Sequence, residues 1–182
     1  MKRTVPTFGL IGGGIAALMM FAAIPVVSRV SYGYLTVLGY TIFVASFLMV
    51  FFGIRSYRDK VGGGTITFGR AFKVGILITL VSCAIYIVSW DIILQRFLPT
   101  FFDDYLNHMV EEMRAAGATE DALNLQMQEN EQFRGWFKNP LIRYTMSFIE
   151  AFPVGLLMTV ISSMVLKRTA TVSSPTSSGQ PR

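Results

Sequence analysis

The sequence predicts an all-α protein in which four helices cross a membrane as a bundle. Its 182 residues are 52% hydrophobic, above the usual share in a soluble domain. The apolar residues gather into four blocks of about 20 residues, and a helix of that length crosses about 30 Å of hydrocarbon. The blocks 8–27 and 34–54 carry no charge, 74–94 carries only Asp91, and 144–166 carries only Glu150.

The first block, 8–27, follows Lys2 and Arg3, a pattern that also occurs in secretory signal peptides. We expect it to remain as a membrane span. The run is longer than a usual signal core, contains Pro25 near its end and is not followed by a small-residue cleavage site before Arg29.

The loop between the second and third blocks predicts the orientation of the chain. It is rich in basic residues and has one acid, Asp59, so the positive-inside rule places it in the cytoplasm. The number of crossings then puts both ends of the chain on that side, where Lys2, Arg3, Lys167 and Arg168 agree with the rule. The basic residues of the loop are also candidate contacts for anionic lipid headgroups, although orientation alone accounts for them. They are Arg55, Arg58, Lys60, Arg70 and Lys73.

Residues 99–138 are too polar to span and too regular for a linker. Apolar side chains recur at three- and four-residue spacing from Phe101 to Met113, which indicates an amphipathic helix. Gly117 fits its end and Thr119 the start of a second helix, while Asn139 and the following proline fit the start of the fourth span. We expect a helical hairpin that rests on the outer membrane surface or covers the mouth of the bundle. Its many acids lack the spacing of a calcium loop, so a solvated face is expected.

Residues 1–168 are expected to form one membrane domain. Residues 169–182 are rich in Ser, Thr and Pro without an apolar period, which predicts a disordered cytoplasmic tail.

Small residues predict where the third and fourth spans pack. Every fourth residue of the fourth span is small, and these residues are Ser147, Ala151, Gly155, Thr159 and Ser163. A second helix can approach closely along such a ridge. Glu150 lies about 60° around the helix from Ser147, at the shoulder of this face. A similar series in the third span, Gly75, Thr79 and Cys83, continues to Asp91, so both acids should face other helices.

Two explanations remain open for these buried acids. In the first, they form ion pairs or hydrogen bonds that fix helix register, with Arg29, Arg96 and Arg143 at the same membrane boundary as partners. In the second, they form a proton or cation site that opens outward, the default expectation for an intramembrane acid. Pro25 and Pro153 either kink their spans and open an outward vestibule, or adjust packing.

Several classes of function are disfavoured. The single cysteine, Cys83, excludes an intramolecular disulfide, and the single histidine, His108, has no partner for a transition-metal site. We expect no cofactor, no metal and no enzymatic activity, because no nucleophile with a base and no cofactor motif is visible. The net charge of +5 follows the topology, so nucleic-acid binding is not expected.

The segments 51–75 ("FFGIRSYRDKVGGGTITFGRAFKVG") and 148–168 ("FIEAFPVGLLMTVISSMVLKR") resemble small bacterial membrane proteins grouped as domain of unknown function 4199. The resemblance covers roughly residues 5–168. It implies a four-span protein of the bacterial inner membrane and brings no established activity. The leading hypothesis is a non-catalytic accessory or assembly component whose outer hairpin meets a partner. The alternative is a proton- or cation-linked transporter or channel subunit, which would need a homo-oligomer because four spans are few for a carrier.

Overall fold

The computed structural model describes residues 1–27 and 29–168, so the predicted tail lies outside the described residues. Within them the chain forms six helices: α1 (Thr4–Val27), α2 (Tyr32–Lys60), α3 (Phe68–Arg96), α4 (Phe101–Ala115), α5 (Glu120–Phe137) and α6 (Pro140–Leu166). Four of them, α1, α2, α3 and α6, are long and apolar enough to cross a membrane. The predicted all-α class and the four spans are therefore confirmed.

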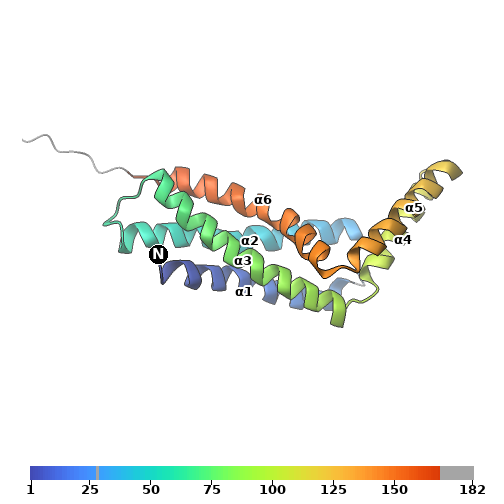
Figure 1. Cartoon of the computed structure of the whole chain (residues 1–182), viewed down its shortest axis with the longest axis horizontal. Helices are drawn as coiled ribbons and strands as arrows, with labels where there is room; N and C mark the ends of the chain where they lie inside the picture. Colours follow the sequence, from blue (N-terminus) through green and yellow to red (C-terminus); the bar gives the residue numbers. More distant parts are fainter. Residues whose placement is uncertain (28, 169–182) are drawn as a thin grey trace, which may run out of the picture.

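The four long helices lie side by side, with α3 in contact with each of the other three. The amino terminus and the end of α6 lie at the same end of the bundle, together with the α2–α3 loop (Figure 1). We call this the loop end. The helices α4 and α5 extend from the other end, which we call the hairpin end.

At the loop end, the chain turns between α2 and α3 through glycines. Gly63 and Gly64 have φ angles of 58° and 87°, which L-amino acids with a side chain rarely adopt. The following Ile66 forms two backbone hydrogen bonds of 2.9 Å with Arg168, just beyond α6. This pairing ties the loop to the end of the fourth span.

The helix α1 packs closely on α2 and α3 because it carries glycines on the facing side. The Ser46 hydroxyl of α2 donates to the Gly12 carbonyl at 2.8 Å, and the Ser82 hydroxyl of α3 donates to the Gly9 carbonyl at 3.2 Å. A Cβ atom on Gly9 would lie 2.6 Å from a Val81 methyl group. The missing side chains thus expose carbonyls to hydroxyls on neighbouring helices.

The interface between α3 and α6 follows the predicted small-residue ridge. All five residues of that ridge are buried, and so are Gly75, Thr79 and Cys83 on α3. The Thr79 hydroxyl lies 3.0 Å from the Thr159 hydroxyl and 3.3 Å from the Gly155 carbonyl. The sequence prediction of this packing face is confirmed.

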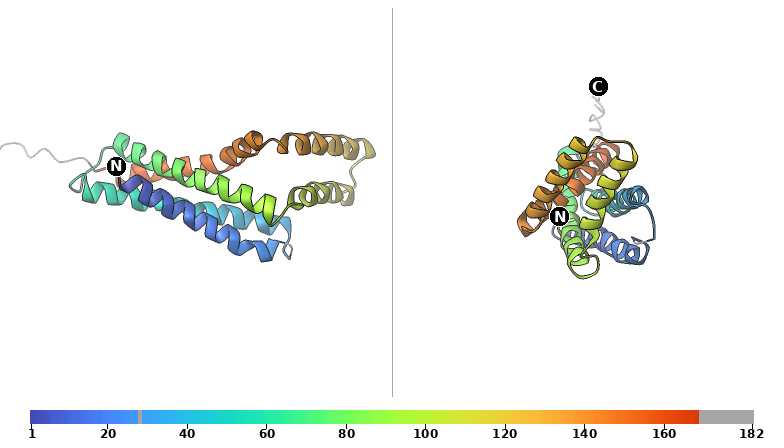
Figure 2. Two further views of the ribbon diagram at one scale, coloured as in Figure 1. Left: turned by 60° about the horizontal axis from the view of Figure 1, so that its bottom comes forward. Right: turned by 90° about the vertical axis from the view of Figure 1, so that its right-hand side faces the viewer.

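The outer helices form the predicted hairpin, but its placement differs from the expectation. Gly117 turns the chain with a φ of 80°, and the Thr119 side chain accepts a hydrogen bond from the Ala122 amide at the start of α5. Figures 1 and 2 show that the hairpin projects beyond the bundle instead of lying across its end. The prediction missed this because an apolar stripe shows that two helices pair and does not fix their direction.

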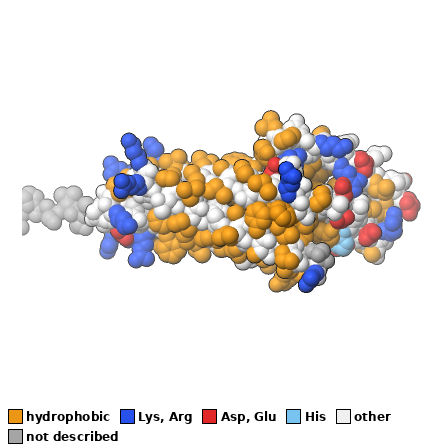
Figure 3. Space-filling view, turned by 90° about the horizontal axis from the view of Figure 1, so that it is seen from below, with side chains coloured by type: hydrophobic (Ala, Val, Ile, Leu, Met, Phe, Trp, Pro, Cys, Tyr) orange, Lys and Arg blue, Asp and Glu red, His pale blue; other side chains and the backbone are white. Residues whose placement is uncertain are grey.

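The surface divides into zones along the long axis (Figure 3). On the face shown, lysine and arginine side chains gather at the loop end, apolar side chains form a band across the middle, and charges of both signs cover the hairpin. This distribution is typical of a multi-pass membrane protein, since charged groups are costly within hydrocarbon.

Candidate functional site at the hairpin end

Asp91, on the last turns of α3, is paired with Arg143 near the start of α6. The Arg143 Nη2 and Nε atoms lie 2.8 and 2.9 Å from Oδ1 of Asp91. The two side chains are only 13% and 15% exposed. A charge pair with this geometry and little solvent is stabilising mainly because neither charge is left alone.

Further hydrogen bonds complete this pair. Gln95 and Tyr144 donate to Oδ2 of Asp91 at 2.6 and 3.2 Å, and Arg143 also donates to the Phe137 carbonyl at the end of α5. Both oxygens of Asp91 are occupied, and Arg143 links three helices. The geometry is that of an ion pair which fixes α6 and the hairpin against α3.

The other two candidate arginines are placed differently. Arg29 and Arg96 are exposed, and among residues 1–27 and 29–168 neither forms an ion pair with Asp91 or Glu150. Of the three arginines considered as partners for Asp91 and Glu150, only Arg143 forms such an ion pair among the described residues. Arg96 lies five residues beyond Asp91, and the 100° turn per residue carries it to another side of α3.

Glu150 lies apart from the Asp91 pair. The residue is exposed at the shoulder of the buried ridge, one and four positions from Ile149 and Met146, which are also exposed, and it lines a cavity at the hairpin end. Tyr86 of α3 lines the same cavity. Within the described parts of the chain Glu150 has no basic partner. The two acids that the sequence grouped together thus have separate surroundings.

The cavity has a volume of about 420 Å³. Residues of α1, α2 and α3 form its walls, Glu150 of α6 contributes a carboxylate, and the first residues of α4 close it toward the hairpin. Phe43 and Tyr86 pack edge to face at 5.0 Å between ring centres, and Trp90 packs on Phe101 at 5.9 Å. The first contact joins α2 to α3, and the second joins α3 to the base of the hairpin at the cavity.

Tyr32, the first residue of α2, is a second anchor for the hairpin. Its ring lies 5.3 Å from the Tyr105 ring and 4.7 Å from the His108 ring, both on α4. His108 also lies 3.1 Å from Glu112, one turn later. The lone histidine thus has a packing role in this conformation.

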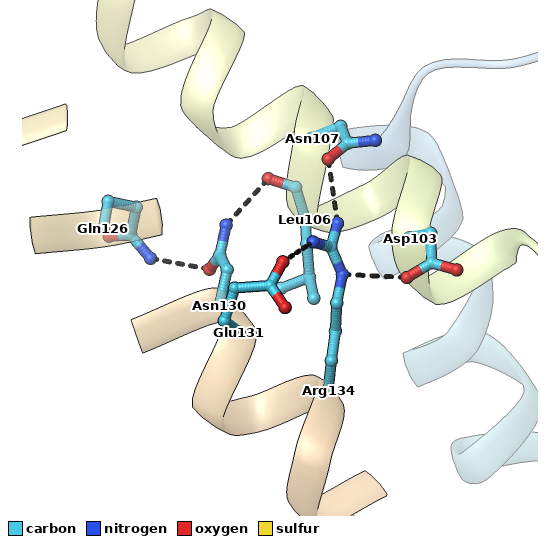
Figure 4. Close-up of polar contacts among 7 residues, drawn as sticks. All are labelled: Asp103, Leu106, Asn107, Gln126, Asn130, Glu131 and Arg134. Carbon is cyan, nitrogen blue, oxygen red and sulfur yellow. Dashed lines mark hydrogen bonds and ion pairs between the residues drawn. The ribbon is translucent and has the colours of Figure 1, made fainter. Parts of the chain in front are cut away.

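Sequence reasoning missed a polar network that joins α4 to α5 (Figure 4). Arg134 donates to Asp103 at 2.8 Å and to Asn107 at 2.9 Å, and it also pairs with Glu131. The buried Asn130 donates to the Leu106 carbonyl at 3.1 Å. These contacts fix the two helices in register.

One signal in the sequence would have found this network. Asn130 lies on the buried stripe of α5, seven residues from both Leu123 and Phe137. A polar residue at such a position needs a partner across the interface. The hydrogen bond with Glu131, together with the charge of Asp103, raises the pKa of the Arg134 guanidinium above its ordinary value, so it is charged at any physiological pH.

The predicted basic cluster lies at the loop end (Figure 3). Arg58 and Arg55 lie 2.7 and 3.8 Å from Asp59, so the single acid of the loop is shared between them. Lys60, Arg70 and Lys73 are exposed. Three basic side chains thus project at the rim of the apolar band.

Comparison with known proteins identifies a family. The family model described as "Protein of unknown function (DUF4199)" matches residues 7–168. The chain belongs to the DUF4199 family. No significant match was found among curated proteins or among solved structures. The match to DUF4199 includes α1 from residue 7 onward and all of α2 to α6. The family assigns no role to the Asp91 pair, the cavity or the hairpin, so those roles have to be argued from their geometry.

Proposed function

We propose that this DUF4199 protein is a non-catalytic component of the bacterial inner membrane whose α4–α5 hairpin binds a protein partner outside the cytoplasm. The observation that carries the proposal is the projection of the hairpin beyond the bundle (Figure 2). A helix pair held by the Arg134 network costs little further ordering when a partner binds.

The outer face of α5 supports a protein partner. Leu125 and Trp136 are 59% and 54% exposed, and their spacing of eleven residues places them on the same side of the helix. Trp is among the residues most enriched at binding interfaces. Exposed apolar side chains outside the apolar band have no lipid to contact.

The basic loop end supports the orientation and a lipid contact. With Lys60, Arg70 and Lys73 at the rim of the band, the positive-inside rule puts the loop end in the cytoplasm and the hairpin in the periplasm. The same residues, with Arg55 and Arg58, attract anionic headgroups by about 1 kcal/mol each near a charged surface.

Site-specific photo-cross-linking tests the partner. A photoreactive residue at Leu125 should give a defined adduct with another protein in intact cells. The matched control is Leu157, which is also 59% exposed but lies within the apolar band of α6 and should give lipid adducts only. Recovery of nothing but lipid, or of the chain itself, from position 125 would contradict the proposal; the latter result would indicate a homo-oligomer instead.

A second function is favoured by one observation, the carboxylate of Glu150 in a cavity at the hairpin end. We infer from it the alternative of a proton- or cation-linked transporter or channel subunit, assembled as an oligomer. Asp91 is engaged by Arg143 and contributes to the structure in this scheme. Reconstituted vesicles test it: proton or cation flux that is identical in Glu150→Gln and the unmodified protein would exclude the alternative.

A further inference from the structure

The cavity at the hairpin end combines one charge with many aromatic rings. Eight of its nineteen lining residues are Phe, Tyr or Trp, and Glu150 is the only charged residue among them. We propose that this cavity binds an organic cation with apolar substituents, such as a substituted ammonium ion, between the Glu150 carboxylate and the aromatic rings. The inference is independent of the partner proposed for the hairpin.

The aromatic rings select for a cation with a diffuse charge. Tyr32, Tyr86, Trp90 and Phe101 come from three helices and line one cavity. The face of an aromatic ring is electronegative, and ammonium groups bind over such faces. An alkylated ammonium loses less hydration energy in such a site than a small inorganic ion, which requires several oxygen ligands. Among the described residues no group of three or more metal-ligating side chains occurs.

The charge of Glu150 selects the sign of the ligand. Unlike Asp91, Glu150 has no basic partner in the described part of the chain. Glu150 is exposed on the bundle surface but lies within a candidate membrane span, where a carboxylate is costly until a cation or a proton meets it. An anionic ligand would be repelled, and a neutral one would leave the carboxylate without compensation.

The dimensions and position fit a small amphipathic molecule. A volume of about 420 Å³ falls within the range of small-ligand cavities, about 300 to 1,000 Å³. The cavity also lies at the hairpin end of the apolar band, where a molecule with a charged group and an apolar part is concentrated at a membrane boundary. An acyl chain of a lipid could fill the same space, but it would make no use of Glu150.

The test compares a cation with its uncharged isostere. Benzyltrimethylammonium and neopentylbenzene have the same shape, because a carbon atom replaces the charged nitrogen. The chain has two tryptophans, so Trp136→Phe leaves Trp90, which lines the cavity, as the only tryptophan, and selective excitation of tryptophan reports on it alone. We expect the cation to change the Trp90 fluorescence saturably and to bind at least about tenfold more tightly than neopentylbenzene, consistent with cation–π and ion-pair attraction.

The charge of Glu150 should account for that preference. Glu150→Gln should reduce it to about twofold or less, and Glu150→Asp should retain a measurable part of it. Glu129→Gln, the same change at an exposed site on α5, should leave it intact. Equal affinities for the two compounds, no saturable response to the cation, or a preference that survives Glu150→Gln would each overturn the proposal. If Glu150→Gln does not fold, the isostere comparison in the Trp136→Phe protein decides.

Discussion

At the level of single residues, the two acids within the spans show how a neighbour determines what a carboxylate does. Asp91 and Glu150 lie at the same end of the bundle, yet only Asp91 meets an arginine among the described residues. Arg143 lies at the end of the first turn of α6, within reach of Asp91, and the Asn139 cap fixes that turn. The ion pair therefore depends on a helix start that precedes the span itself.

The Asp91 pair should be strongly coupled in a double-mutant cycle. We expect Asp91→Asn and Arg143→Gln each to lower the free energy of unfolding by about 1 to 3 kcal/mol, because each leaves a poorly solvated charge without its partner. The double variant should lose less than the sum by at least about 0.5 kcal/mol. Denaturation of the single and double variants in detergent measures these free energies of unfolding. Additive losses would show that the two residues stabilise the protein separately.

At the level of elements, glycines set the distance between helices. Gly13 and Gly14 are neighbours on α1, but only Gly13 faces a packed surface: a Cβ there would lie 2.6 Å from Cβ of Ile85, whereas at Gly14 it would meet nothing within 4 Å. Since Cβ of Ile85 cannot move without its helix, α1 and α3 would have to separate.

Alanine at these two adjacent positions should therefore have opposite effects. We expect Gly13→Ala to reduce the unfolding free energy by about 1 to 3 kcal/mol through overpacking. Gly14→Ala should be neutral or stabilising, because alanine favours helix without a steric cost. Thermal unfolding of the two variants in the same detergent provides the comparison, and equal melting temperatures would contradict the close contact.

The hairpin is a second element whose register rests on few side chains. We expect Arg134→Gln to raise amide hydrogen exchange in α4 and α5 by about fivefold, equivalent to roughly 1 kcal/mol for a partly exposed network, with no change in the four spans. Arg114→Gln, at an exposed position of α4, is the control. Because the pKa of Arg134 is raised in the folded protein, its contribution is fully present at neutral pH and is lost only when the pH rises into strong alkali. Unchanged hydrogen exchange in Arg134→Gln would show that the aromatic contacts between α4 and α5 are enough to hold the hairpin together.

At the level of the whole molecule, the two ends differ in charge, and this difference should fix the orientation. In a Cys83→Ala background, Lys60→Cys and Gln128→Cys introduce thiols at exposed positions at opposite ends. We expect a membrane-impermeant maleimide added to intact cells to label position 128 and to reach position 60 only after lysis. The unmodified chain serves as the control, because its single cysteine, Cys83, is fully buried and should not react with the maleimide. Labelling in the reverse order would overturn the proposed topology.

Much of this architecture could be predicted because a membrane imposes simple patterns. The four spans, the Gly117 turn, the Thr119 and Asn139 caps and the small-residue ridge of α6 all follow from local sequence. The candidate site was less predictable. The identity of the arginine that pairs with Asp91 depends on how α3 and α6, which are far apart in sequence, are rotated about their axes. The cavity depends on where the helices of the bundle separate. No local sequence pattern encodes either feature.

Several of the closest glycine contacts lie toward the end of the bundle opposite the cavity. The sites where an added Cβ would collide, such as Gly9, Gly53 and Gly75, lie toward the loop end, where the Ile66 and Arg168 backbones are also joined. The empty volume lies beside the hairpin. The hairpin end should therefore be the more compressible end of the bundle. Lateral tension or altered thickness of the surrounding lipid would deform the protein there first, while the helices would keep their relative positions at the loop end.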